Sequence, residues 1–204
     1  IGTPKLLLLS GIGPAKELKQ LGIDVVRDSP EVGKNLQDHL DIFLIYEVTR
    51  SNSYDRYKKL RWQIWAGLQF ALFRSGPITS NVVEAGGFWW SGKREGLPDI
   101  QFHFLAGAGV EAGIPDVPGG AGCTLNSYLV RPKSRGTVTL KSPNPKDHPV
   151  IDPNFLDHPD DLAGTVESVR LGRHIMSQEA LRPHVVREHY PGAKIESQDE
   201  LEDF

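Results

Sequence analysis

The sequence contains seven histidines and one cysteine, residue types that often bind metals or act in catalysis. His184 and His189 are five residues apart, which would place them on different sides of a helix. No H-E-x-x-H or similar ligand spacing occurs. The single cysteine, Cys123, excludes an internal disulfide and every multi-cysteine metal site. Because no basic residue lies beside it, we expect Cys123 to be a buried or half-buried thiol. From the spacing of the histidines and the single cysteine, we expect no metal site.

Motifs for covalent catalysis and phosphate binding are also missing from the sequence. There is no G-x-S-x-G elbow, and Ser134, in an S-R-G turn, has no base near it in the sequence. No G-x-G-x-x-G or Walker-type loop occurs, and S-G-I-G at residues 10–13 lacks one glycine of a phosphate loop. Acids occur at Asp38, Asp41, Glu84 and the Asp160-Asp161 pair, without a spacing that identifies a general acid and its base.

The composition is that of an ordinary globular protein. The 204 residues include 23 Lys and Arg and 26 Asp and Glu, and the net charge of -3 argues against a dedicated nucleic-acid binder. The longest apolar stretch, residues 64–73, is shorter than the roughly 20 residues that span a bilayer. The only methionine is Met176, so Ile1 is not a translation start, and we expect the chain to be a piece of a longer protein.

Hydrophobic periodicity indicates the elements that must position these side chains. Residues 58–74 predict a helix with an apolar stripe, expected in the core or at an interface, made of Trp62, Ile64, Trp65, Leu68 and Leu72. Residues 157–177 predict a second helix, with Asp160 and Asp161 at its positive end. Strands are predicted at residues 41–49, 82–90, 100–105, 125–130 and 136–141.

The first forty residues are typical of an α/β arrangement. A buried apolar element over residues 5–10 ends at a glycine turn, a helix opens at Gly13-Pro14, and a brief strand covers residues 23–26. The whole chain predicts a fold between α/β and α+β, with a mainly antiparallel sheet covered by helices. The glycine-rich segment 106–123 predicts a long loop, either a lid over a pocket or an exposed flexible loop.

Two long motifs resemble one known family. T-P-K-L-L-L-L-S-G-I-G at residues 3–13 is similar to the second signature of the glucose–methanol–choline (GMC) flavin oxidoreductases, and V-G-K-N-L-Q-D-H at 32–39 resembles a second stretch of that family. The segments 98–103, 131–140 and 150–162 also resemble family segments. The resemblance covers the whole chain and is strongest to choline-dehydrogenase-like and alcohol dehydrogenase members.

The resemblance implies an enzyme that uses FAD to take a hydride from an alcohol carbon to flavin N5, which yields an aldehyde or ketone. In the family, a G-x-G-x-x-G segment holds the FAD diphosphate and an H-x-x-G-T segment carries the catalytic base. The first is expected before Ile1 and the second after Phe204. We therefore expect no catalytic residue in this chain and no activity from it alone.

The resemblance also divides the chain into three parts. Residues 1–40 would be a partial FAD-binding domain, residues 41–152 the substrate-binding domain, and residues 153–204 a helical segment that begins the C-terminal part. Gly2 and Thr3 would lie near the cofactor. Asn35 and His39 would either contact the cofactor or belong, with Asp38, to a hydrogen-bonded loop that holds two domains in place.

Two residues are candidates for the substrate pocket. His103 matches a place where choline-oxidising relatives have a pocket histidine, and it could hydrogen-bond a developing alkoxide. The alternative is a strand histidine satisfied by the sheet edge. Glu84 could offer a carboxylate to a cationic substrate such as choline, with Trp89 or Trp90 nearby for a cation–π contact, or it could be a plain surface acid.

Two other functions stay open beside alcohol oxidation. One is a hydroxynitrile-lyase-like member of the same fold, which keeps FAD without net redox chemistry, and the other is a non-catalytic binding domain. The expected partners are a small alcohol, the remainder of the same polypeptide and an electron acceptor of unspecified kind, with homo-oligomerisation open and no nucleic acid. The expected location is cytoplasmic, with attachment to a membrane surface as the alternative.

Overall fold

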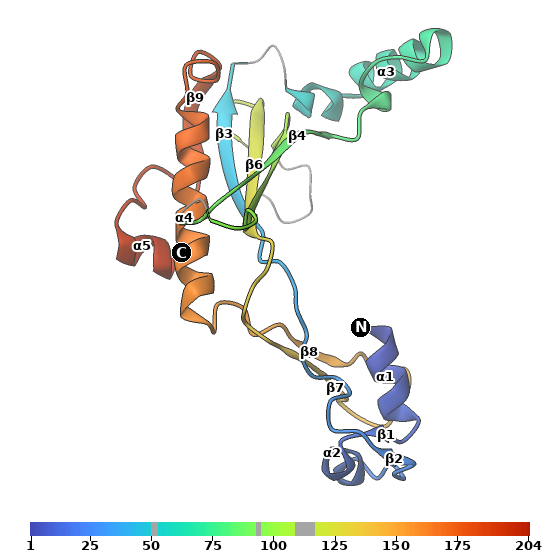
Figure 1. The fold of residues 1–204 in the computed structure, drawn as a ribbon. Helices are drawn as coiled ribbons and strands as arrows, with labels where there is room; N and C mark the ends of the chain where they lie inside the picture. Colours follow the sequence, from blue (N-terminus) through green and yellow to red (C-terminus); the bar gives the residue numbers. More distant parts are fainter. Residues whose placement is uncertain (50–52, 93–94, 109–116) are drawn as a thin grey trace. The chain divides into compact units, whose positions relative to one another are not determined.

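The computed structural model describes residues 1–49, 53–92, 95–108 and 117–204. The chain forms two compact units, each made from two segments that are far apart in the sequence. Unit 1 comprises residues 1–40 and 131–162, and unit 2 comprises residues 41–130 and 163–204. Figure 1 shows the helices and strands of both units.

Unit 1 contains short elements only. They are α1 (Gly2–Leu9), β1 (Ile12–Gly13), α2 (Ala15–Gln20), β2 (Arg27–Asp28), β7 (Thr137–Thr139), β8 (Val150–Asp152) and the start of α4 (Pro159–Met176). Strand β1 pairs in parallel with β2, and β7 pairs antiparallel with β8. The helix expected after Pro14 is confirmed as α2. The apolar run at 5–10 forms most of α1, in which only Leu8 is buried, and the early strand lies at 27–28 instead of 23–26.

The division into units differs from the boundaries expected from the sequence. Residues 131–152, expected in the substrate domain, belong with residues 1–40. The reason is backbone pairing: Leu36 and Gly136 form an antiparallel bridge, and the Val138 amide donates to the Gly33 carbonyl at 2.7 Å. Gly33 has a φ of +84°, and a Cβ there would collide with the Val138 carbonyl oxygen, so this contact requires glycine.

Unit 2 is built around a five-stranded antiparallel sheet in the order β4-β5-β6-β3-β9. Its elements are β3 (Ile42–Val48), the 3-10 helix η1 (Tyr54–Lys58), α3 (Leu60–Phe73), the 3-10 helix η2 (Pro77–Thr79), β4 (Val83–Trp89), β5 (Ile100–Leu105), β6 (Gly122–Leu129), the rest of α4, β9 (Val185–Tyr190) and α5 (Gln198–Asp203). The last part of the chain is therefore not purely helical, because β9 pairs with β3 at the sheet edge.

Helix α4 covers one face of this sheet (Figure 1). The buried core between them contains Leu44, Tyr46, Ile100, Phe102, Cys123, Leu125, Val166, Val169 and Met176. Because side chains alternate along a strand, Ile100 and Phe102 of β5 face this core, and Gln101 and His103 face the opposite side. This alternation decides where the candidate site forms.

The expected main strands and both long helices are confirmed, with ends that differ by a few residues. The placement of the apolar stripe of α3 in a core is not supported within this chain, because Ile64, Trp65, Leu68 and Leu72 are more than half exposed. Most of the expected lid at 106–123 lies outside the described residues, and its end, Gly122-Cys123, already belongs to β6.

Candidate functional site

A group of polar side chains lies on the sheet face opposite α4. Strands β5 and β6 pair so that His103 is opposite Asn126 and Gln101 is opposite Tyr128. These four side chains therefore share one face, which we call the polar face. Asn126 and Tyr128 are buried, and Gln101 and His103 are half-buried.

His103 is held at the centre of the polar face. Its Nε2 lies 2.8 Å from the side-chain nitrogen of Gln101 and 3.4 Å from the Tyr128 hydroxyl oxygen. The rings of His103 and Tyr128 meet edge to face, with centroids 5.6 Å apart. Because an amide nitrogen can only donate, Nε2 of His103 accepts this hydrogen bond. A neutral ring then carries its proton on Nδ1.

An acid supports the polar face from the start of β3. The Asn126 side-chain nitrogen donates to the Asp41 carboxylate at 2.7 Å. Burial, and secondly the negative charge of Asp41, raise the pKa of Tyr128, so that its hydroxyl stays protonated. The Oδ1 of Asn126 is buried and has no hydrogen-bond partner among the described residues. Such an acceptor is suited to a donor from a ligand, a water molecule or another part of the protein.

Glu84 lies at a different place in unit 2, beside η1 and η2. Its Oε1 accepts hydrogen bonds from the Ser80 hydroxyl at 2.6 Å and from the Tyr54 hydroxyl. These two bonds, that from Ser80 first, lower the pKa of the Glu84 carboxyl. The hydrogen bond that the Tyr54 hydroxyl donates to Glu84 also raises the pKa of Tyr54. Glu84 is exposed and lines a pocket of about 400 Å³ together with Tyr54, Arg56, Tyr57 and Ser80 among others.

The structure does not bring Trp89 or Trp90 to Glu84. Trp89 follows Glu84 by five residues along β4, which is about 16 Å in an extended strand. The two tryptophans contact one another edge to face, with centroids 5.8 Å apart. The aromatic rings near Glu84 are those of Tyr54 and Tyr57 in η1. Nothing in the local sequence around Glu84 indicates them, because they lie about thirty residues earlier.

The candidate cofactor residues Gly2 and Thr3 form the N-terminus of α1, in unit 1. Both are exposed, and a Cβ at Gly2 would meet nothing within 4 Å. Ile1, at the N-cap position, provides no side-chain hydrogen bond to the first turn. The amides of Gly2 and Thr3 therefore lack an intrahelical acceptor. An open helix N-terminus of this kind fits an anionic group.

Asn35 and His39 lie on the loop that ends unit 1. Asn35 is exposed with a φ of +60°, a left-handed conformation that asparagine tolerates better than most residues. The backbone amide of the exposed His39 donates to the Asp38 carboxylate at 3.0 Å. Between them, Leu36 pairs with Gly136. The loop thus has hydrogen bonds of its own. Such bonds are expected if Asn35 and His39 belong to a hydrogen-bonded loop that does not contact the cofactor.

Sequence reasoning missed Gln101, Asn126 and Tyr128. Gln101 could have been found from the sequence, because a residue two positions before His103 on a strand lies on the same face of the sheet. Asn126 and Tyr128 depend on the β5–β6 register, which pairs residues about 25 apart. No group of three or more His, Cys, Asp or Glu suited to a metal ion occurs among the residues that the structure describes.

Two family models and several known proteins match this chain. Residues 1–41 and residues 132–204 match an N-terminal and a C-terminal family model, both described as GMC oxidoreductase. An alcohol dehydrogenase (acceptor) from Pseudomonas putida is 42% identical over 202 residues, covering 98% of this chain and 36% of that protein. An oxygen-dependent choline dehydrogenase from Brucella anthropi is 40% identical, covering 100% and 37%. The chain thus spans little more than a third of these relatives.

Solved structures of two oxidases have a fold similar to that of this chain. A formate oxidase from Aspergillus oryzae, studied for its FAD modification, has a TM-score of 0.89 at 28% identity and covers 98% of this chain and 40% of its own. A pyridoxine 4-oxidase from Mesorbium loti has a TM-score of 0.77 at 25% identity and covers 100% and 36%.

Proposed function

The chain belongs to the GMC oxidoreductase family, and from this premise we propose that it is part of a larger FAD-dependent enzyme that oxidises an alcohol to an aldehyde or ketone. FAD, when bound, accepts the hydride that leaves the alcohol carbon. The observation that carries the proposal is the polar face around His103, which supplies hydrogen-bonding groups in a half-buried setting.

The role we assign to the polar face is to bind and orient the alcohol oxygen. Since Nε2 of His103 accepts from Gln101, a neutral His103 ring carries its proton on Nδ1, which can serve as a donor. The Tyr128 hydroxyl, kept protonated by burial, has its one proton for Nε2 of His103, 3.4 Å away, and so helps to hold the ring in place. Donors held in place around an oxygen stabilise the negative charge that develops there as its proton leaves. We propose that the base that takes this proton belongs to a part of the enzyme outside these 204 residues.

The test is anaerobic flavin reduction by an alcohol, measured on the whole protein. His103→Ala should slow reduction about tenfold or more and leave the FAD content unchanged. His184→Ala, at an exposed histidine of the same unit, is the matched control and should reduce at the wild-type rate. Equal rates in wild type and His103→Ala would remove His103 from the site. A wild-type flavin that stays oxidised with every alcohol would favour the lyase and overturn the oxidoreductase proposal.

A cationic alcohol such as choline is the narrower proposal for the substrate. Glu84 provides a carboxylate whose lowered pKa keeps it charged, and Tyr54 and Tyr57 provide aromatic rings in the same pocket. Arg56 also lines this pocket and opposes a cation. Glu84→Gln should raise KM for choline and leave KM unchanged for the neutral isostere with carbon in place of nitrogen. An equal change for both alcohols would exclude the charge recognition.

Gly2 and Thr3 would hold an anionic part of FAD through their backbone amides, and Asn35 and His39 would border the same cofactor. Thr3→Asp separates cofactor binding from folding. A carboxylate in the first turn stabilises a helix by about 0.3–1 kcal/mol, yet it repels an anion bound there. We expect retained thermal stability with reduced FAD content, measured from the flavin absorbance. Wild-type FAD content in Thr3→Asp would contradict the assignment.

A further inference from the structure

A buried carboxylate of unit 2 lies outside the polar face. Asp55, in η1, is 8% exposed, and the role proposed for the polar face does not involve it. A carboxylate is rarely buried unless charged or hydrogen-bonding groups satisfy its oxygens. The groups that satisfy Asp55 therefore indicate what its burial achieves.

Both oxygens of Asp55 accept hydrogen bonds from the residues around them. Oδ2 accepts from the Ser53 hydroxyl at 2.6 Å and from the Gly122 amide at 2.8 Å. The Ala108 amide shares its proton between Oδ2 at 3.1 Å and Oδ1 at 3.3 Å. Nζ of Lys58 lies 3.0 Å from Oδ1. Because all these partners donate, an asparagine at this position would turn its NH2 group against donors in either orientation.

The donors to Asp55 join η1 to parts of the chain that are distant in the sequence. Ala108 and Gly122 lie near the two ends of the glycine-rich segment 106–123. Lys58 of η1 binds Ala108 a second time, because its Nζ donates to the Ala108 carbonyl at 2.9 Å. A Cβ at Gly122 would lie 2.5 Å from that of Ala108, so this close approach requires glycine. The Asp55 carboxylate therefore holds η1 against both ends of the segment.

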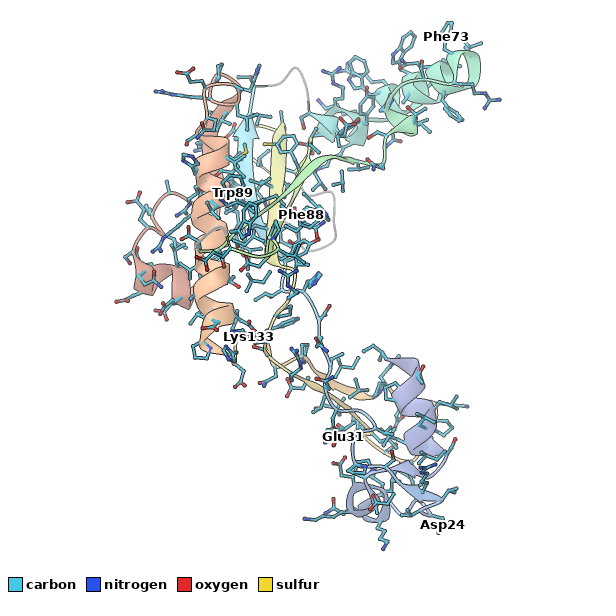
Figure 2. All side chains as sticks on the ribbon, viewed as in Figure 1. Asp24, Glu31, Phe73, Phe88, Trp89 and Lys133 are labelled. Carbon is cyan, nitrogen blue, oxygen red and sulfur yellow. The ribbon has the colours of Figure 1, made fainter. Side chains whose placement is uncertain are left out.

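The element that carries Asp55 is short and depends on such contacts. With five residues, η1 has few hydrogen bonds of its own, and Ser53 caps its start by accepting from the Asp55 amide at 3.2 Å. Figure 2 shows the side chains of η1 on the ribbon where the chain continues into α3. In the described part of the chain, neither α3 nor any other helix is long and apolar enough to cross a membrane.

The residue before Asp55 reaches Glu84. The Tyr54 amide donates to the Ala106 carbonyl at 2.6 Å, so the backbone on both sides of this peptide is bound to the glycine-rich segment. From there the Tyr54 hydroxyl donates to Oε1 of Glu84, on β4. The rings of Tyr54 and Tyr57, both in η1, have centroids 6.0 Å apart. The position of η1 therefore determines whether these two tyrosines line the pocket around Glu84.

We propose that Asp55 is a positioning residue for the pocket around Glu84. Its carboxylate holds η1 against the two ends of the glycine-rich segment, and η1 in turn holds the Tyr54 hydroxyl on Glu84. The inference rests on the role proposed for Glu84 in recognising a cationic alcohol, yet the position of Tyr54 can be measured without substrate. The measurable quantity is the pKa of Glu84, which the bond from Ser80 and then the bond from Tyr54 lower.

The test is Asp55→Asn in the whole protein, with the pKa of Glu84 followed by carboxyl carbon NMR. The pKa of Glu84 should rise as far as it does in Tyr54→Phe, because the same hydrogen bond is lost. Loss of the Asp55 charge by itself has the opposite sign, since removal of a nearby negative charge lowers the pKa of a carboxyl. Asp203→Asn, the same change at an exposed position of unit 2, is the matched control and should leave the pKa of Glu84 unchanged.

The double variant Asp55→Asn/Tyr54→Phe tests whether the effect passes through Tyr54. The pKa of Glu84 in this variant should equal that in Tyr54→Phe alone, because the bond that Asp55 maintains is already absent. A further rise in the double variant would overturn the proposal. An unchanged or lowered pKa of Glu84 in Asp55→Asn would overturn it too.

Ser53→Ala provides a milder variant in case Asp55→Asn does not fold. It removes one donor from Asp55 and should raise the pKa of Glu84 in the same direction by less, and the absence of any rise contradicts the positioning role.

The KM for choline separates this inference from the proposed function. In Asp55→Asn it should increase about two- to tenfold, because the Tyr54 and Tyr57 rings are displaced from the cation. If the pKa of Glu84 rises while this KM stays unchanged, Asp55 does position Tyr54, and recognition of a cation by Glu84 is wrong.

Discussion

The side-chain nitrogen of Gln101 lies 2.8 Å from Nε2 of His103, on the same face of strand β5. This hydrogen bond makes Nε2 an acceptor and leaves the proton of the neutral ring on Nδ1. The neighbouring Phe102 faces the core, so the backbone of β5 holds both polar side chains in place. Gln101, two residues before His103 on the same strand, therefore determines which tautomer the neutral His103 ring adopts.

Removal of this donor should affect catalysis through His103. Gln101→Leu keeps the volume of the side chain but loses its N–H, so the ring is free to move its proton to Nε2. In the whole protein we expect kcat/KM for the alcohol to fall about tenfold, with an unchanged melting temperature and FAD content. Steady-state kinetics and absorbance spectra measure the three quantities. Unchanged kinetics would mean that the tautomer of His103 has no part in the reaction.

Asp161 should make unit 1 sensitive to acid. Its carboxylate accepts bonds from the Ser134 amide and hydroxyl at 2.7 and 2.6 Å and from the Lys133 amide at 2.8 Å. Burial alone would raise the pKa of Asp161, but these bonds outweigh it and hold the pKa below the ordinary 3.8. The charged form therefore stabilises the fold above about pH 4, and this contribution is lost as the pH falls through the lowered pKa.

Asp161→Asn measures that contribution. At pH 7 the variant should be less stable by about 1–3 kcal/mol, since two backbone amides and a hydroxyl then face an amide group. In urea titrations the difference from wild type should shrink toward pH 3. Asp160→Asn is the control, because its side chain is 62% exposed and should change stability little. A difference that does not vary with pH would contradict the assignment.

The two hydroxyls at Glu84 should have unequal effects on its pKa. Ser80 contributes more to the lowering of that pKa than Tyr54 does. Both Ser80→Ala and Tyr54→Phe should therefore raise the pKa of Glu84, and Ser80→Ala should raise it further. Carboxyl carbon NMR across the acid range gives both shifts. The reverse order would show that the Tyr54 bond is the dominant one.

Two helical glycines should respond oppositely to alanine. A Cβ at Gly172 of α4 would collide with Cδ1 of Leu44, which is fully buried, so Gly172→Ala should cost about 1–3 kcal/mol. A Cβ at Gly67 of α3 meets nothing within 4 Å, so Gly67→Ala should stabilise by about 0.5–1 kcal/mol. Urea unfolding of both variants tests the pair, and a stabilising Gly172→Ala would show that this core has room.

Cys123 should be unreactive in the folded protein. Burial, and secondly the charge of Asp55, raise the pKa of its thiol to about 12. Its reaction with a disulfide reagent at neutral pH should be roughly a hundredfold slower in the native protein than in urea. Because it is the only cysteine, the measured rate belongs to this residue alone. Equal rates in both conditions would show that β6 opens readily.

Local features of the sequence were sufficient for much of the fold. The alternation in residues 41–49 predicted β3 correctly, and the periodicity in 157–177 predicted α4, because both depend on neighbours within a few residues. The motifs at 3–13 and 32–39 were sufficient to indicate the family. The function of His103, Glu84, Gly2, Thr3, Asn35 and His39 stays a prediction, whereas their places in the fold are now defined.

Relationships between distant segments could not be predicted. Strand β9 joins the edge of the sheet beside β3, Leu36 pairs with Gly136, and Tyr54 bonds to Glu84. Each depends on which backbone groups and side chains find partners after the whole chain has folded, and the residues near each partner in sequence carry no sign of the other.

The sequence by itself determined the main strands and both long helices, the family and the presence of an apolar stripe on α3. Only the tertiary structure decided that His103 shares its face with Asn126 and Tyr128 and that the apolar side of α3 is not buried within this chain. The physical reason is that periodicity specifies which side of an element is apolar or polar, while strand register and packing between distant segments decide what that side meets.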